Sequence, residues 1–398
     1  MNFYQKSLET YADCIAILLD ETHNRLVAIY SDRTMFISDI TSLEKTKIVR
    51  SFISHSSTIH DIQTLENSSL EVTFYATGSV DQTVRIWNLV DEEEDRQNIS
   101  MIKLPGLRRN LYTRNLSKIL YMGDKYDHFK SNASPVSPEK QVRCLKCSHD
   151  GQYLAVGDQD GVLKVFSLVT FSKVKEVTSH NQEILCLDFT PENPENNWFL
   201  ASGSRDRLIH VYNVNRNFEF VVSIDDHNAS ISALKFAYLK SKGSLILVSC
   251  GADKSLIFRE FKGIGGGGGF IQYHVEIDKF NKFFTLDVNH DSNIAVLGQE
   301  KKIQFWSLED CKLKNVIETK EEDKNSGKAV GLDNLRVAVD GSGSYVAVSN
   351  SDKVVRIRDF ASGNIVAKAS CGDITTSLCF AMNSKQLITV TAKGKNIC

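Results

Sequence analysis

The chain has 398 residues, of which 42% are hydrophobic and 24% are charged, and its formal net charge at pH 7 is −2. A charge so near zero, with no basic excess, argues against nucleic acid or an anionic membrane as partner. The N-terminal residues lack a signal-peptide pattern, no apolar run approaches the ~18 residues of a membrane span, and nine cysteines form no spaced framework. We therefore expect a cytoplasmic protein with reduced thiols.

A short unit recurs along the chain: an apolar strand, a tight turn with an acidic residue, and a strand of alternating polarity. The turn acids of the five clearest copies are Asp81, Asp160, Asp206, Asp253 and Asp352, and weaker copies carry Asp32 and Glu300. Successive turn acids are 46–52 residues apart, except for one gap of 79 residues. A fixed period of this length is typical of a repeat architecture.

Each copy begins with an apolar run rich in Val, Ile and Phe. These runs span residues 14–18, 59–65, 142–147, 184–189, 231–236, 283–288, 335–339 and 374–380. Gly, Asp, Asn and Ser separate them from further short runs, and helical spacing is not sustained, so we expect strands throughout. Four antiparallel strands per copy, arranged radially, predict an all-β fold of the β-propeller type.

The repeat resembles the WD repeat: a turn aspartate, an aromatic residue six positions later, and a histidine in the preceding loop. More specifically, segments 143–152, 183–189, 204–214, 225–237 and 249–259 are similar to the WD-repeat scaffold family of the mitogen-activated-protein-kinase-binding protein and the microcephaly-associated spindle-pole protein. The resemblance implies a non-enzymatic protein–protein interaction scaffold in kinase signalling or spindle-pole and centrosome organisation. Kinases or cytoskeletal and spindle-pole components would be its partners, at the centrosome, spindle pole or cytoskeleton.

Eight repeat units divide the chain into residues 1–53, a leading unit that is either left over or the first blade, and residues 54–398, the propeller. The last unit is incomplete, and an open sheet edge needs another strand to close it. Residues 47–52 would close it to give seven blades, which we favour, and residues 2–8 would give eight. In the resembling family two propellers lie in tandem, and the leading unit matches the end of the upstream one.

The long gap predicts an insertion over residues 90–140, between the second and third repeats. It opens with the acidic run 91–95, and its apolar middle, 104–122, is expected to pack on the propeller rim as extra strands. Ser134 and Ser137 each precede a proline and are candidate sites of proline-directed phosphorylation. The glycine-rich residues 263–269 predict a loose hairpin loop between the third and fourth strands of their repeat.

In a WD repeat the loop histidine, a strand hydroxyl, the turn aspartate and the aromatic residue form one hydrogen-bonded chain. The expected sets are His55, Thr77, Asp81 and Trp87; His180, Ser202, Asp206 and Tyr212; and His227, Ser249 and Asp253, with Arg259 in the aromatic position. A catalytic triad is the other interpretation of His, Ser and Asp, but three copies at one spacing favour a structural role. Buried polar groups of this kind must all be paired.

Other candidate sites are weaker. Cys144 and Cys147 form a C-x-x-C inside a predicted strand, and no second pair exists, so we predict packing rather than zinc binding. Arg205 and Arg207 flank a turn aspartate at the top of the propeller and are the candidate protein-binding residues, although Arg205 could simply pair with a neighbouring carboxylate. We expect no cofactor, no metal, no small-molecule substrate, no nucleic acid and no membrane.

Two rival functions remain. The upstream propeller and the C-terminal kinase-binding region of the resembling family have no counterpart in these 398 residues, so a cytoskeletal or ciliary adaptor becomes the rival if the chain is complete. A substrate receptor of a ubiquitin ligase is the other rival, but such receptors usually carry Trp-Asp-x-Arg after the third strand. The corresponding residues here begin Trp87-Asn88, Tyr212-Asn213 and Trp306-Ser307.

Overall fold

A computed structural model gives the fold of the protein. It describes residues 14–20, 24–30, 34–41, 47–52, 55, 57–65, 74–88, 116–122, 141–194, 197–264, 267–279, 281–289, 294–299, 301–322, 329–331, 334–340, 342–381, 386–392 and 396–397. Within these residues, regular structure is β-strand apart from one short 3-10 helix, Val214–Arg216. The predicted all-β fold is confirmed.

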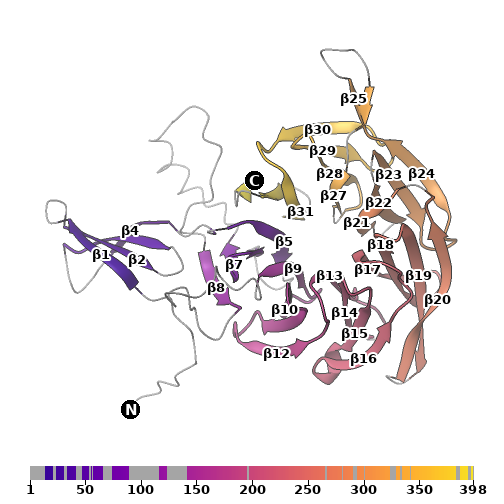
Figure 1. The fold of residues 1–398 in the computed structure, drawn as a ribbon, viewed down its shortest axis with the longest axis horizontal. Helices are drawn as coiled ribbons and strands as arrows, with labels where there is room; N and C mark the ends of the chain where they lie inside the picture. The colour runs from indigo at the N-terminus through magenta and orange to yellow at the C-terminus, as the bar shows by residue number, and fades with distance from the viewer. Residues whose placement is uncertain are drawn as a thin grey trace.

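Among the described residues, seven antiparallel sheets stand in a ring, each a blade named here by its strands (Figure 1). The blades are β5 (Ile59–Leu65), β6 (Phe74–Ser79), β7 (Thr83–Asn88) and β8 (Leu116–Tyr121); β9 (Val142–Cys147), β10 (Tyr153–Asp158), β11 (Val162–Ser167) and β12 (Lys173–Thr178); β13 (Ile184–Phe189), β14 (Phe199–Ser204), β15 (Ile209–Asn213) and β16 (Glu219–Ile224); β17 (Ile231–Leu239), β18 (Ser244–Gly251), β19 (Ser255–Ile264) and β20 (Gly267–Ile277); β21 (Phe283–Asn289), β22 (Ile294–Gln299), β23 (Lys302–Ser307) and β24 (Leu313–Glu318); β27 (Asn334–Val339), β28 (Tyr345–Asn350), β29 (Val354–Asp359) and β30 (Ile365–Ser370); and β31 (Thr375–Ala381), β32 (Gln386–Thr391) and β33 (Asn396–Ile397). A small hairpin, β25 (Lys320–Glu322) and β26 (Ala329–Gly331), precedes β27.

The first strand of each blade lines the centre of the ring, and the fourth strand, in the six blades where it is described, lies at the rim (Figure 1). The second strand β14 is buried along its whole length, whereas the rim strand β30 is exposed along its whole length. The apolar faces of neighbouring blades pack together, as where Val84 and Ile86 meet Val142 and Leu145. Each blade thus buries both faces against its neighbours, which is what the alternating apolar runs require.

The ring closes where the last blade meets the first. Ile388 and Val390 of β32 share a core with Ile62 and Trp87. The Thr376 hydroxyl donates to the Ile59 carbonyl oxygen at 2.6 Å, and the Ser377 hydroxyl donates to Asp61 Oδ1 at 2.7 Å. Side chains and apolar packing hold the two ends of the described ring together.

Three expectations about particular segments are wrong. Residues 47–52 do not close the last sheet, because they form β4 (Lys47–Phe52) and pair with β3 (Met35–Asp39) in a sheet with β1 (Cys14–Asp20) and β2 (Arg25–Tyr30). That sheet lies to one side of the ring (Figure 1). Residues 2–8, the other candidate, lie outside the described residues.

Within the predicted insertion, residues 116–121 are not an extra strand but β8, which pairs with β7 as the rim strand of the first ring blade. The glycine-rich residues 263–269 do lie at the junction of the third and fourth strands of their blade, but they do not form a loose loop, since β19 and β20 pair as far as Ile264 and Gly267. Glycine makes this pairing close: a Cβ on Gly268 would lie 2.5 Å from the Gly263 Cα atom. The acidic run 91–95 lies outside the described residues.

Candidate functional site: buried networks beneath the turn face

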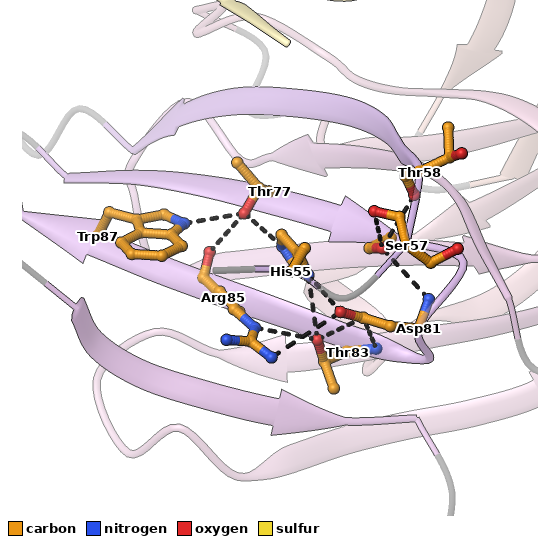
Figure 2. A network of polar contacts seen from close by, with 9 residues as sticks. His55, Ser57, Thr58, Thr77, Asp81, Thr83, Arg85 and Trp87 are labelled. Atoms are coloured by element: carbon orange, nitrogen blue, oxygen red, sulfur yellow. Dashed lines mark hydrogen bonds and ion pairs between the residues drawn. The ribbon is translucent and has the colours of Figure 1, made fainter. Parts of the chain in front are cut away.

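In the β5–β8 blade, four side chains form one hydrogen-bonded chain (Figure 2). His55 Nδ1 lies 2.8 Å from Asp81 Oδ2, and His55 Nε2 lies 2.7 Å from Thr77 Oγ1. The Trp87 indole N–H donates to the same Thr77 oxygen at 2.8 Å. Since Asp81 accepts the Nδ1 proton, Nε2 is the acceptor, and the Thr77 hydroxyl donates to it.

The protonation states of His55 and Asp81 follow from their burial. Burial lowers the pKa of His55 below its usual value, and the Asp81 carboxylate opposes this only in part, so the imidazole is neutral. Burial alone would raise the pKa of Asp81, but His55, Arg85 and the Thr83 hydroxyl together bring it well below its usual range. The result is an ionised carboxylate that orients a neutral imidazole.

Asp81 also fixes the turn between β6 and β7. Its Oδ1 accepts from the Thr83 backbone N–H at 3.0 Å and from the Thr83 hydroxyl at 2.6 Å. Gln82, between them, has a left-handed φ of 65°. Such a conformation is costly for a residue with a side chain unless its surroundings fix it. The equivalent turn residues Arg207 and Lys254 have φ of 77° and 65°, so each aspartate holds one strained turn in place.

The β13–β16 blade has an equivalent hydrogen-bonded network, with one more hydroxyl between its histidine and its aromatic residue. His180 Nδ1 lies 3.1 Å from Asp206 Oδ2, and His180 Nε2 lies 2.8 Å from Ser202 Oγ. Tyr212 does not reach Ser202; its hydroxyl donates to Ser179 Oγ at 2.8 Å, and Ser179 lies 3.3 Å from Ser202. The expectation of a direct Tyr212–Ser202 link is therefore wrong, because the phenol needs a hydroxyl from the loop to complete the chain.

The β17–β20 blade uses a charged donor instead of an aromatic one. His227 Nδ1 lies 3.0 Å from Asp253 Oδ2, and His227 Nε2 lies 2.7 Å from Ser249 Oγ. Arg259 donates to Ser249 Oγ at 2.8 Å through Nη1 and to Asp226 Oδ2 at 2.8 Å through Nε. The guanidinium group takes the place of the indole N–H, and Asp226 compensates its charge.

These sets have the bond pattern of a Ser–His–Asp triad, yet their hydroxyls cannot meet a substrate. The side chains of Thr77, Ser202 and Ser249 are each 0% exposed. A nucleophile must approach the atom that it attacks. These hydrogen bonds therefore hold the loops and turns at one end of the ring in place.

Arg205 and Arg207 lie at that end, called the turn face here, in the turn between β14 and β15. Both are exposed, and the Arg205 side chain is 64% exposed. Arg205 Nη1 lies 2.8 Å from Glu183 Oε1, while Glu183 Oε2 also meets Arg143 Nη2 at 2.5 Å. The pairing with a neighbouring carboxylate thus exists, and it leaves most of the Arg205 side chain open to solvent.

Several residues of the networks were not identified from the sequence. Thr83 and Ser255, each two positions after a turn aspartate, donate their hydroxyl protons to that aspartate at 2.6 Å. A recurring Asp-x-Ser/Thr was the signal that could have found them. Ser179 and Asp226 carried no such signal, because their partners lie 33 residues away along the chain.

The remaining candidates are placed as follows. The Cys144 thiol is buried and donates to the Ile184 carbonyl oxygen, whereas Cys147 is half-buried and donates to that of Ser148. In the residues that the structure covers, no three His, Cys, Asp or Glu side chains gather in a way that could hold a metal ion. The same residues include no helix long and apolar enough to cross a bilayer. Ser134 and Ser137 lie outside the described residues.

Comparison with known proteins gives consistent matches. Residues 46–88 match the family WD domain, G-beta repeat, and residues 115–192 match the Anaphase-promoting complex subunit 4 WD40 domain. WD repeat-containing protein 62 of Mus musculus is 30% identical over 98% of this chain and 25% of its own length. Mitogen-activated protein kinase-binding protein 1 of Homo sapiens is 31% identical over 77% of this chain and 20% of its own length.

The chain thus spans a fifth to a quarter of the length of these two curated relatives. Among solved structures, U3-55K superposes with a TM-score of 0.63 at 16% identity, covering 86% of this chain and 95% of that one. The RRP9 WD40 repeats superpose with a TM-score of 0.62, also at 16% identity, covering 86% and 94%. At this identity the two structures support the fold alone.

Proposed function

Because the chain belongs to the WD-repeat family of WD repeat-containing protein 62 and mitogen-activated protein kinase-binding protein 1, we propose that it is a non-enzymatic scaffold that binds other proteins through its turn face. Residues 54–398 form the binding body in this proposal, and residues 1–53 form a separate leading unit. The His–Ser/Thr–Asp sets hold the turns and loops of that body and perform no chemistry.

The observation that supports the proposal most directly is an exposed arginine, Arg205, on a turn that hydrogen bonds hold in place. Asp206 accepts from the Leu208 and Asn181 backbone N–H groups at 3.0 and 3.1 Å, which ties the turn to the preceding loop. The exposed Arg205 and Arg207 flank this aspartate. Arg side chains are favoured in protein interfaces because a planar, weakly hydrated cation is easily desolvated. A surface that is already ordered loses little entropy on binding.

The kind of partner is argued from kinship. One relative is by name a mitogen-activated protein kinase-binding protein. Accordingly, the partner in this proposal is a protein kinase or a cytoskeletal or spindle-pole component, met in the cytoplasm.

The proposal is tested by affinity capture of the tagged chain from native cells, with the captured proteins quantified by mass spectrometry. The double variant Arg205→Glu and Arg207→Glu is expected to lose the kinase or spindle-pole partner. The matched control is Arg216→Glu, since Arg216 is also exposed but follows β15 at the opposite end of the blade. Equal capture by both variants would contradict the turn face, and capture of ligase adaptors alone would contradict the partner class.

A further inference from the structure

The inner strands enclose a cavity of about 570 Å³ at the centre of the ring. Each inner strand carries a register irregularity after its first residue, as between Ile59 and Asp61 in β5. A β-bulge of this kind redirects side chains locally, and here His60 and Asp61, two consecutive residues, both line the cavity. The first residues of the inner strands therefore contribute consecutive side chains to the cavity end that lies beneath the turn face.

Two arginines line this end of the cavity, which is called the mouth here. Arg143 of β9 places Nη1 3.1 Å from His60 Nε2, and Arg336 of β27 also lines the cavity. Burial, followed by the positive charges of Arg143 and Arg336, lowers the pKa of His60 to about 4. Both guanidinium groups thus act on one neutral imidazole, although they come from strands on different sides of β5.

The acidic groups nearby are already engaged. Glu183 is shared between Arg143 and Arg205. Asp61 accepts from the Leu145 and Ile62 backbone N–H groups, each at 2.8 Å, and from the Ser377 hydroxyl at 2.7 Å. The described hydrogen bonds of Arg336 go to carbonyl oxygens, from Nε to Thr376 at 2.7 Å and from Nη1 to Leu335 at 3.1 Å.

Farther along the cavity, carboxylates outnumber ammonium groups. Lys146 Nζ lies 2.8 Å from Asp188 Oδ1, and Lys235 Nζ lies 2.9 Å from Asp287 Oδ1. Glu192 and Asp340 also line this part of the cavity, so the excess charge there is negative. A positive excess is confined to the mouth, where Arg143, Arg205 and Arg336 stand against two carboxylates, those of Glu183 and Asp61, and Asp61 also interacts electrostatically with Arg336.

We propose that the mouth of the central cavity, lined by Arg143, Arg336 and His60, binds a phosphate group carried on a phosphorylated side chain of a partner protein. This rests on the proposed scaffold role and names the chemistry of its partner. A guanidinium fork matches phosphate oxygens in a bidentate manner, and two forks from different blades suit a dianion better than a single carboxylate. The cavity has room for a phosphorylated side chain and its neighbouring residues.

The test uses fluorescein-labelled peptide pools and fluorescence anisotropy with the full chain. One pool holds a fixed phosphoserine between randomised residues, and matched pools hold serine or glutamate there. The phosphoserine pool is expected to bind at least about tenfold more tightly than the other two, with an affinity that falls as salt rises. Equal binding of the serine pool overturns the site, and equal binding of the glutamate pool overturns its preference for phosphate.

Variants then locate the site. Arg143→Gln and Arg336→Gln are each expected to weaken binding about tenfold, because each removes one charge-assisted contact. Arg143→Lys keeps the charge but loses the fork and should fall in between. Arg216→Gln is the matched control, and thermal unfolding of each variant checks the fold. Wild-type affinity in both glutamine variants overturns the assignment, as does binding of inorganic phosphate alone as tightly as the peptide pool.

The two proposals fail separately. Capture of a kinase or spindle-pole protein that depends on Arg205, without binding of the phosphoserine pool, overturns only the phosphate site. Binding of the pool that depends on Arg143 and Arg336, without capture of such a partner, overturns only the proposed partner class.

Discussion

In the β5–β8 and β17–β20 blades, different side chains donate a hydrogen bond to the buried hydroxyl beside the histidine. In both, His Nε2 lies 2.7 Å from a buried hydroxyl, and that oxygen accepts a further N–H at 2.8 Å. The donor is the neutral Trp87 indole in one blade and the charged Arg259 in the other. The difference between these two blades teaches that the position requires a hydrogen-bond donor rather than an aromatic ring. A charged donor brings a further requirement, the carboxylate of Asp226.

The largest expected effect comes from removing that carboxylate. In the variant Asp226→Ala, the guanidinium of Arg259 stays 0% exposed with its ion partner lost. Breaking a buried pair costs about 3–5 kcal/mol, and we expect about 3 kcal/mol because the Asp226 side chain is 27% exposed. Chemical denaturation measures the loss in the free energy of unfolding.

Asp225→Ala is the matched control, since Asp225 is the exposed neighbour of Asp226. Its expected change is within ~0.5 kcal/mol, as for other surface substitutions. Equal losses in the two variants would show that Arg259 does not depend on its ion pair, and the two blades would then differ in composition only.

Whether the sequence predicts a feature of these blades depends on how far apart along the chain the interacting residues lie. The first strands of three blades, Ile59–Leu65, Val142–Cys147 and Ile184–Phe189, are predicted with their observed limits, because an apolar run between turn residues is local information. Strand β8 was missed because Leu116–Tyr121 lies deep inside a long gap between repeats, where no spacing marks it.

The contacts of Arg259 and Arg143 were beyond the sequence for a different reason. Asp226 stands beside His227 in the chain, and nothing local shows that strand register carries Arg259 back to it. The cavity mouth depends on the irregularity near the start of each inner strand, which alters the two-residue alternation. A residue such as Arg143 therefore cannot be assigned to the cavity from alternation alone.

A change of pH tests the ionisation of His180 in the β13–β16 blade. Burial and the stacked His210 ring, 4.2 Å away, lower the pKa of His180 to about 4, although Asp206 opposes them. An unfolded histidine has a pKa near 6.5, so the unfolded chain binds the proton first. The stabilisation that the neutral His180 contributes is fully present above pH ~6.5 and is lost as pH falls toward 4. The loss in the free energy of unfolding reaches about 2 kcal/mol at pH 5.

Urea denaturation at pH 7 and pH 5 measures this loss. The variant His210→Gln removes one cause of the low pKa, so its stability should fall less between the two pH values. His149→Gln, which changes an exposed histidine, should keep the wild-type pH dependence. If His210→Gln loses as much stability as the wild type, the stacked ring does not set the ionisation of His180.

The smallest expected effect is that of Trp87→Phe. Phenylalanine keeps a ring where Trp87 stacks on Tyr75, with centroids 6.2 Å apart, but removes the N–H that donates to Thr77. We expect a loss of about 1 kcal/mol for that hydrogen bond, in addition to the packing cost of a smaller ring. The matched control is Trp306→Phe, because the Trp306 indole donates to Gln304 Oε1 at the same 2.8 Å outside any His–Asp chain. The difference between the two variants isolates the link to His55 and Asp81. A loss in Trp87→Phe as large as that in Asp226→Ala would mean that the neutral donor matters as much as the ion pair, and the charge of Arg259 would no longer distinguish the two blades.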